Sequence, residues 1–204
     1  MLELYEWPPT RSQRAKWVLE EVGMPYSSHL LDMNAGEQKT EEYKAISPLS
    51  VVPALKSGDY TMFESVAIVL QQIDEHPERC LAPAIGTAER ALYYQWSVFA
   101  CAELDPALMM IFDNTMRPIS QKGSYNRNLA EQGRQDFAVR ADVVSKALKG
   151  RDYLLGGNFS GADILIGHSC FMATLIGVIS DYPVLQAYLD RLKLRPAYQR
   201  AYNF

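Results

Sequence analysis

The first residues that could perform chemistry form a hydroxyl-rich segment, Thr10-Arg11-Ser12-Gln13-Arg14, at the start of a predicted helix. The first turn of a helix presents backbone N–H groups without intrahelical partners, and the helix dipole adds positive character there. A hydroxyl beside such groups is well placed to donate to an anion. Because Ser and Thr are also common N-caps, the segment by itself is compatible with an ordinary cap as well.

Two residue pairs flank a predicted hairpin. Val52-Pro53 precedes a short strand, and a cis bond before the proline would turn the Val52 N–H and C=O outward, toward a peptide-like ligand. Glu64-Ser65 begins the helix after the hairpin, so a carboxylate and a hydroxyl stand beside free N–H groups. This combination suits a ligand that carries both an ammonium and a carboxylate.

The elements that position these residues follow from the periodicity of the first 76 residues, which changes between strand-like alternation and helical spacing. The predicted order is a strand at 2–6, a helix up to Gly23, a strand at 29–31, a short helix at 41–45, strands at 53–56 and 60–63 around a turn at 57–59, and a helix from 64. The apolar positions of the two longer helices are Ala15, Val18, Leu19 and Val22, and then Val66, Val69, Leu70 and Ile73. The pattern is βαβ, a short helix, then ββα.

Residues 77–87 have the composition of a linker, with prolines and a glycine among small residues. Beyond it only helical periodicity remains, so residues 88–204 are predicted to be all helix. Ser160 and Asp163 precede an apolar helix and have the spacing of a capping box, which gives this Asp an architectural role. The predicted buried faces are Leu92, Trp96, Phe99 and Ala100; Phe137, Ala141, Val144 and Leu148; and Leu185, Tyr188, Leu189 and Leu192.

Together these features resemble the cytosolic glutathione transferases, in particular a bacterial, theta-like or serine-type member. The resemblance is carried by LELYEWPPTRSQRAKWVLEEVG, by SPLSVVPALKSGDYTMFESVAIVLQQIDE and by GRDYLLGGNFSGADILIG. It implies an α/β plus all-α fold, with a thioredoxin-like N-terminal domain at 1–76 and a helical-bundle domain at 88–204. It also implies an enzyme of detoxification with glutathione as co-substrate.

The resemblance assigns roles to the residue pairs. Val52 pairs with the cysteinyl part of glutathione beside cis-Pro53, while Glu64-Ser65 holds the γ-glutamyl end. Gln38 and Lys39 occupy the loop that reaches the glycyl carboxylate.

The catalytic group must favour the thiolate of glutathione, because a free thiol with a pKa near 8.5 is mostly protonated at neutral pH. Lowering that pKa by two units requires about 2.7 kcal/mol, and one charge-assisted hydrogen bond supplies most of it. Thr10 aligns with the serine of theta-like relatives and is the expected donor. Ser12 is the first alternative and Tyr5 the second, and Arg11 adds a favourable field.

The electrophile is expected between the domains, where Glu103, Asp105, Met109 and Phe112 follow at near-helical spacing. Met and Phe suit an adaptable apolar pocket. The family resemblance also implies a homodimer, in which Asp105 would approach the γ-glutamyl ammonium across the interface.

Composition agrees with a small-molecule enzyme. The 204 residues are 48% hydrophobic, and the net charge of -4 gives no reason to expect nucleic-acid binding. A cytoplasmic, metal-free protein without a membrane segment is expected, because the N-terminus lacks signal-peptide character and the three cysteines form no CxxC pair.

Three functions are compatible with this sequence. The first is transfer of glutathione to a small hydrophobic electrophile. The second is a glutathione-dependent reductase or peroxidase, which would form oxidised glutathione in place of a conjugate. The third is a non-catalytic interaction protein of the same fold, which would not bind glutathione.

Overall fold

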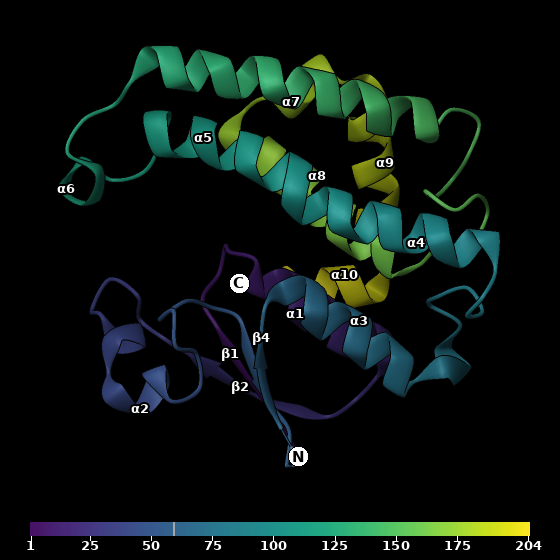
Figure 1. The fold of residues 1–204 in the computed structure, drawn as a ribbon, viewed down its shortest axis with the longest axis horizontal. Helices are drawn as coiled ribbons and strands as arrows, with labels where there is room; N and C mark the ends of the chain where they lie inside the picture. The colour runs from purple at the N-terminus through teal and green to yellow at the C-terminus, as the bar shows by residue number, and fades with distance from the viewer. Residues whose placement is uncertain (59) are drawn as a thin grey trace. The chain divides into compact units, whose positions relative to one another are not determined.

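The computed structural model describes residues 1–58 and 60–204, leaving aside the side chains of residues 120 and 122. Contacts divide the chain into two compact units. The first unit comprises Met1–Ala82 and Leu194–Phe204, and the second comprises Pro83–Lys193. Figure 1 shows the elements of both.

The first unit contains a four-stranded mixed sheet of order β2-β1-β3-β4. Strand β1 pairs parallel with β2, as the crossover through helix α1 requires, and antiparallel with β3, which pairs antiparallel with β4. This confirms the predicted βαβ-α-ββα order and the thioredoxin-like class. The elements are β1 Leu2–Glu6, α1 Ser12–Val22, β2 Tyr26–Leu30, α2 Glu41–Lys44, β3 Ala54–Lys56, β4 Thr61–Phe63 and α3 Ser65–Glu75.

Three predicted details of this unit need correction. Strand β2 begins at Tyr26, three residues before the predicted strand, and Leu31 lies outside it. In α3 the buried positions include Ile68 and Gln72, whereas Val66 and Leu70 are only half-buried. At the hairpin, Ser57 and Tyr60 exchange backbone hydrogen bonds, and the predicted turn residue Asp59 lies outside the described residues.

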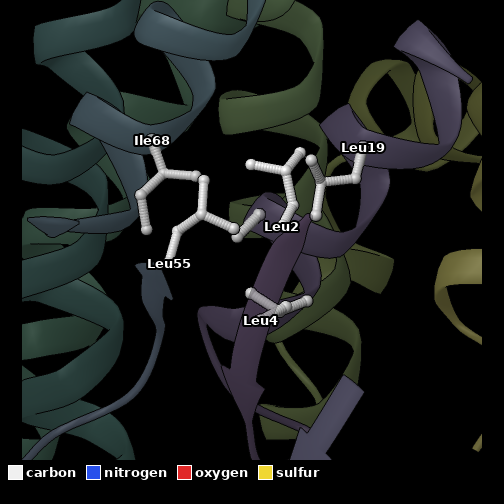
Figure 2. Packing of buried hydrophobic residues seen from close by; sticks show 6 residues of the cluster. Leu2, Leu4, Leu19, Leu55 and Ile68 are labelled. Carbon is white, nitrogen blue, oxygen red and sulfur yellow. The ribbon is translucent and has the colours of Figure 1, made fainter. Parts of the chain in front are cut away.

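The core of the first unit forms between the sheet and helices α1 and α3, which lie side by side (Figure 1). Leu2 and Leu4 alternate onto this face, where they meet Leu19 of α1, Leu55 of β3 and Ile68 of α3 (Figure 2). Each such buried side chain contributes about 1.5–3 kcal/mol relative to an exposed one. This packing holds α1 and α3 against the sheet, so the first residues of both helices have fixed positions beside the strands that precede them.

The C-terminal segment belongs to the first unit, which corrects the predicted boundary of the helical domain at residue 204. Helix α10, Pro196–Ala201, packs on α1, where the Tyr198 ring meets Trp17 edge-on at 4.9 Å between centroids. Arg195 forms two hydrogen bonds to the Glu21 carboxylate, at 2.7 and 2.8 Å. These contacts give the last eleven residues a partner that helical periodicity alone does not reveal.

The second unit is all helix in its described residues. Its elements are α4 Ala88–Phe99, a π-helical turn at Ala100–Leu104, α5 Asp105–Thr115, α6 Ile119–Lys122, α7 Arg127–Ala147, α8 Gly161–Ile176 and α9 Pro183–Lys193. The predicted faces of α7 and α9 are buried, as expected. The predicted face of α4 is correct at Trp96, which is buried, and wrong at Leu92, which is 43% exposed, because α4 buries the neighbouring Tyr93.

Helix α8 begins with the predicted capping box. The Ser160 side chain accepts a hydrogen bond from the Asp163 backbone N–H, and the Asp163 carboxylate accepts one from the Ser160 backbone N–H. Asp163 also accepts from the Leu154 N–H and the Tyr188 hydroxyl, so its carboxylate joins three segments of the second unit. Its role is architectural, as the sequence indicates. No helix in residues 1–58 and 60–204 has both the length and the apolar character needed to cross a bilayer.

Candidate active site

The strand register brings three of the predicted site segments of the first unit to one edge of its sheet. Tyr5 of β1 lies opposite Ala54 of β3, which lies opposite Phe63 of β4. From this row, β1 leads into the Thr10 loop, β3 is entered from Val52-Pro53, and β4 leads into Glu64-Ser65. Three segments distant in sequence therefore reach the same edge.

Thr10 lies in the loop between β1 and α1 and is partly exposed. Its hydroxyl donates to the Trp7 carbonyl and accepts from the Ser12 N–H at 3.2 Å. Its own N–H donates to the Gln13 side chain at 2.9 Å, which completes a reciprocal cap at the start of α1. Thr10 thus caps the start of α1 and is still partly exposed to solvent.

Ser12 is fully buried and is the first residue of α1. Its oxygen accepts from the Trp7 N–H at 3.1 Å and lies 2.7 Å from the Thr10 hydroxyl oxygen. Because the Thr10 proton is directed to Trp7, the Ser12 proton is the one available between the two hydroxyls. The pair forms a chain of hydrogen bonds that ends at Thr10, the more exposed member.

Tyr5 faces the side of the sheet opposite Leu4. Its ring stacks on His29 at 4.8 Å and contacts Tyr43 of α2 at 5.6 Å. Its hydroxyl approaches Glu3 at 3.4 Å, and burial together with the Glu3 charge raises the pKa of Tyr5. A hydroxyl in this setting gives up its proton less readily than a free tyrosine does.

The Val52–Pro53 peptide bond is cis, as expected. In the part of the chain that the structure describes, neither the Val52 N–H nor its C=O forms a hydrogen bond. The adjacent Val51 carbonyl, in contrast, accepts from the Tyr43 hydroxyl and from the Ser47 hydroxyl, both at 2.9 Å. The free backbone groups of Val52 are the kind that pair with an extended peptide.

Glu64 and Ser65 begin α3 with unusual geometry. Glu64 has φ 75° and ψ 107°, a conformation that costs a non-glycine residue about 1–3 kcal/mol. Its side chain is exposed, whereas Ser65 is 5% exposed. The Ser65 hydroxyl forms no hydrogen bond to the described residues, so a donor remains available at the helix N-terminus.

Gln38 and Lys39 lie on a short 3₁₀ turn, Glu37–Lys39, and differ in exposure. Gln38 is 7% exposed, and its amide donates to the Met33 carbonyl at 3.3 Å, which ties the loop together. Lys39 is exposed, and its side chain forms no ion pair within residues 1–58 and 60–204. Lys39 is therefore the member of this pair that is free to meet a carboxylate.

The four candidates of the second unit separate into different environments. The π-helical turn, where the Asp105 N–H donates to the Ala100 carbonyl, inserts one residue and changes the helix phase. Glu103 forms an ion pair with Arg140 of α7 at 2.9 Å, and Asp105 is 6% exposed and accepts from Ser169 of α8 at 3.0 Å.

Asp105 is thus buried within the second unit. Met109 and Phe112 lie on α5 and remain half-buried, as pocket-lining residues are. No group of three or more His, Cys, Asp and Glu side chains suited to a metal ion occurs among the described residues.

Tyr43 and Ser47 are the residues of this site that sequence reasoning missed. Both are buried polar side chains, at 3% and 0% exposure, in the segment just before Val52. Their only sequence signal is a hydroxyl pair at i and i+4 in a short helix and its exit. Only the folded loop shows that both hydroxyls bind the Val51 carbonyl.

Comparison with known proteins adds independent evidence. The family model "Glutathione S-transferase, N-terminal domain" matches residues 1–70, and "Glutathione S-transferase, C-terminal domain" matches residues 104–196. Glutathione S-transferase F10 of Arabidopsis thaliana is 27% identical to this chain over 197 residues, which cover 92% of this chain and 90% of the relative.

Solved structures agree over nearly the whole chain. The ternary complex of BphK, a bacterial GST, has a TM-score of 0.86 and 29% identity, covering 98% of this chain and 96% of that chain. A glutathione transferase from Burkholderia graminis, with two glutathione molecules bound per subunit, has a TM-score of 0.85 and 26% identity, covering 98% and 86%. With both domain models matched in order and the site geometry in place, the chain belongs to the cytosolic glutathione S-transferase family.

Proposed function

We propose that the sheet edge at Tyr5, Ala54 and Phe63 binds glutathione and that Thr10 stabilises its thiolate for addition to a small hydrophobic electrophile. Membership of the family gives the chain a glutathione-binding, transferase-like enzymatic function. The observation that carries it is the strand register, which brings the Thr10 loop, Val52 and Ser65 to one edge.

Each part of glutathione has a chemically suitable partner at this edge. The free Val52 N–H and C=O suit the cysteinyl backbone, and the unpaired Ser65 hydroxyl suits the γ-glutamyl carboxylate. The exposed Glu64 carboxylate suits the γ-glutamyl ammonium, which gives its strained backbone a functional reason. Lys39 suits the glycyl carboxylate.

Stabilisation of the glutathione thiolate is the step to which the chain must contribute most. When the sulfur arrives, the Thr10 proton changes its acceptor from the Trp7 carbonyl to the thiolate, and Ser12 continues to donate to the Thr10 oxygen. A hydrogen bond to a charged group is worth about 1.5–3 kcal/mol, which is comparable to the roughly 2.7 kcal/mol that a two-unit lowering of the thiol pKa requires. The N-terminus of α1 adds a smaller contribution of the same sign.

A second candidate function is reduction of a glutathione-containing disulfide or peroxide. It is favoured by the Burkholderia graminis structure, which holds two glutathione molecules per subunit. Reduction of a mixed disulfide of glutathione uses two glutathione units: the thiolate of one attacks the sulfur of the glutathione unit in the mixed disulfide, the S–S bond breaks, the other thiolate leaves, and oxidised glutathione forms. The Thr10 hydroxyl would serve this reaction equally, because both reactions need the thiolate.

We also propose that the chain forms a homodimer and that it is cytoplasmic. Helices α4, α5 and α7 offer long faces, and exposed apolar side chains such as Val98 and Val139 lie on them. Paired faces of this kind are usual in two-fold assemblies.

The test of the proposed function is calorimetric titration of the chain with glutathione, followed by product analysis. Binding, with formation of a thioether from an aryl halide, supports transfer. Accumulation of oxidised glutathione from a mixed disulfide, without a thioether, favours the reductase. Absence of binding at millimolar glutathione contradicts both functions.

A further inference from the structure

The Val51 carbonyl is held by two buried donors. The Tyr43 hydroxyl and the Ser47 hydroxyl both donate to it at 2.9 Å, so both of its lone pairs are used. Tyr43 comes from α2, whose first turn is capped by the Thr40 hydroxyl. Ser47 follows α2 and is fully buried.

This arrangement determines the direction of the next N–H group. The Val51 carbonyl and the Val52 N–H belong to one planar trans peptide unit, in which C=O and N–H point in opposite directions. A carbonyl fixed toward buried donors therefore fixes the Val52 N–H toward the opposite side. There the Val52 N–H meets no acceptor among residues 1–58 and 60–204.

Tyr43 can perform this role over the whole physiological range of pH. Burial raises the pKa of Tyr43 to about 12, so its hydroxyl keeps its proton and remains a donor. Tyr43 is 3% exposed and Ser47 is fully buried, so a ligand does not contact either hydroxyl directly. Their effect on a ligand must pass through the peptide unit that they hold.

We propose that Tyr43 and Ser47 are positioning residues for glutathione, because together they hold the Val51–Val52 peptide unit with its N–H aimed at the cysteinyl backbone of the ligand. This inference rests on the proposed function of the sheet edge. It adds a specific claim, namely that the two donors hold the carbonyl jointly, so that loss of one loosens the peptide unit and loss of both frees it to rotate.

The experiment compares Tyr43→Phe, Ser47→Ala and the double variant by calorimetric titration with glutathione. Each single variant should raise Kd less than threefold, and the double variant about tenfold or more. The thiol pKa in the complex and kcat at saturating glutathione should stay close to the parent values, because Thr10 is untouched. Ser47→Thr in the Tyr43→Phe background keeps one hydroxyl, so its Kd should return from the value of the double variant to that of Tyr43→Phe alone.

Tyr26→Phe is the matched control, because it removes a partly buried tyrosine hydroxyl that donates to Glu20 at 2.8 Å in the same unit. It should leave Kd unchanged. If the double variant does not fold, the glutathione-induced shift of the Val52 amide proton in the two single variants replaces it, and this shift should be smaller than in the parent chain.

The outcomes separate the two claims. No glutathione binding by the parent chain overturns the proposed function and this inference with it. Binding by the parent chain, with an unchanged Kd in the folded double variant or an equal rise in Tyr26→Phe, overturns this inference alone.

Discussion

The Ser12 and Thr10 hydroxyl oxygens lie 2.7 Å apart, and only Thr10 is accessible to a ligand. A hydroxyl that accepts a hydrogen bond is a better donor through its own proton, since hydrogen bonds in a chain polarise one another. Ser12 is therefore placed to strengthen the Thr10 hydroxyl as a partner for an anion. This relationship gives the two residues different roles, which the first two predictions distinguish.

Thr10→Val should raise the pKa of bound glutathione by about one to two units, because it removes the hydroxyl and keeps the shape of the side chain. Thiolate absorbance measured against pH reports this pKa directly. Turnover at neutral pH should fall by about the same factor of 10 to 100, with Kd for glutathione nearly intact. Thr10→Ser, which keeps the hydroxyl, is the control, and a thiol titration unaffected by Thr10→Val would exclude Thr10 as the donor.

Ser12→Ala should raise the thiol pKa by a smaller amount, on the order of half a unit, because the donor to Thr10 is lost while Thr10 remains. The double-mutant cycle is the decisive measurement. In the Thr10→Val background, Ser12→Ala should have no further effect on the thiol pKa. An additive shift would show that Ser12 acts on the sulfur by a separate route.

Ser65→Ala should weaken glutathione binding by about 1.5–3 kcal/mol, the range for a hydrogen bond to a charged group. The thiol pKa should not change, because the γ-glutamyl end is remote from the sulfur. Ser27→Ala on β2 is a matched control, since its hydroxyl only approaches the Met1 sulfur at 3.6 Å. Equal affinity of the Ser65→Ala and Ser27→Ala variants by calorimetry would remove Ser65 from the site.

Arg195→Ala should lower the free energy of unfolding by about 1–3 kcal/mol, because it leaves the Glu21 carboxylate, 8% exposed, without its charged partner. Denaturant titration measures this change. Lys44→Ala removes the exposed pair with Glu41 and should change stability by no more than about 1 kcal/mol. Similar effects of the two substitutions would mean that the C-terminal segment adds little to the first unit.

Light scattering at micromolar concentration should report a particle of twice the 23.0 kDa chain mass. The physical reason is the set of exposed apolar side chains on α4 and α7, including Leu92, Val98 and Val143. Val98→Glu should shift the distribution toward monomer. A fully active monomer in the parent chain would contradict the proposed assembly.

Where local pattern decides structure, the sequence was informative. The apolar face of α1 and the capping box of Ser160 and Asp163 depend on spacing within one element, and both were predicted correctly. Strand β2 was placed too late, because Tyr26, Ser27 and Ser28 show no hydrophobic alternation on this edge strand. The sheet order and the domain class nevertheless followed from the succession of elements.

Features that depend on distant contacts or on helix phase were not predictable. Glu103 pairs with Arg140 of α7 and Asp105 accepts from Ser169 of α8, so their environments depend on how these helices pack, and a π-helical turn at Ala100–Leu104 separates Glu103 from the regular spacing of α5. The hydrogen bonds of Ser12 and Thr10 to the Trp7 backbone depend on where Trp7 lies after the chain turns. Neither effect leaves a signal in residue spacing.

The return of α10 to α1 has a consequence for synthesis of the chain. The ribosome makes residues 1–82 first, yet Tyr198, which covers Trp17, is among the last residues to emerge. Domains generally fold as units during translation, at about 5–20 residues per second. The nascent first unit must therefore wait several seconds, while the whole second unit is translated, with the Trp17 surface of α1 still uncovered.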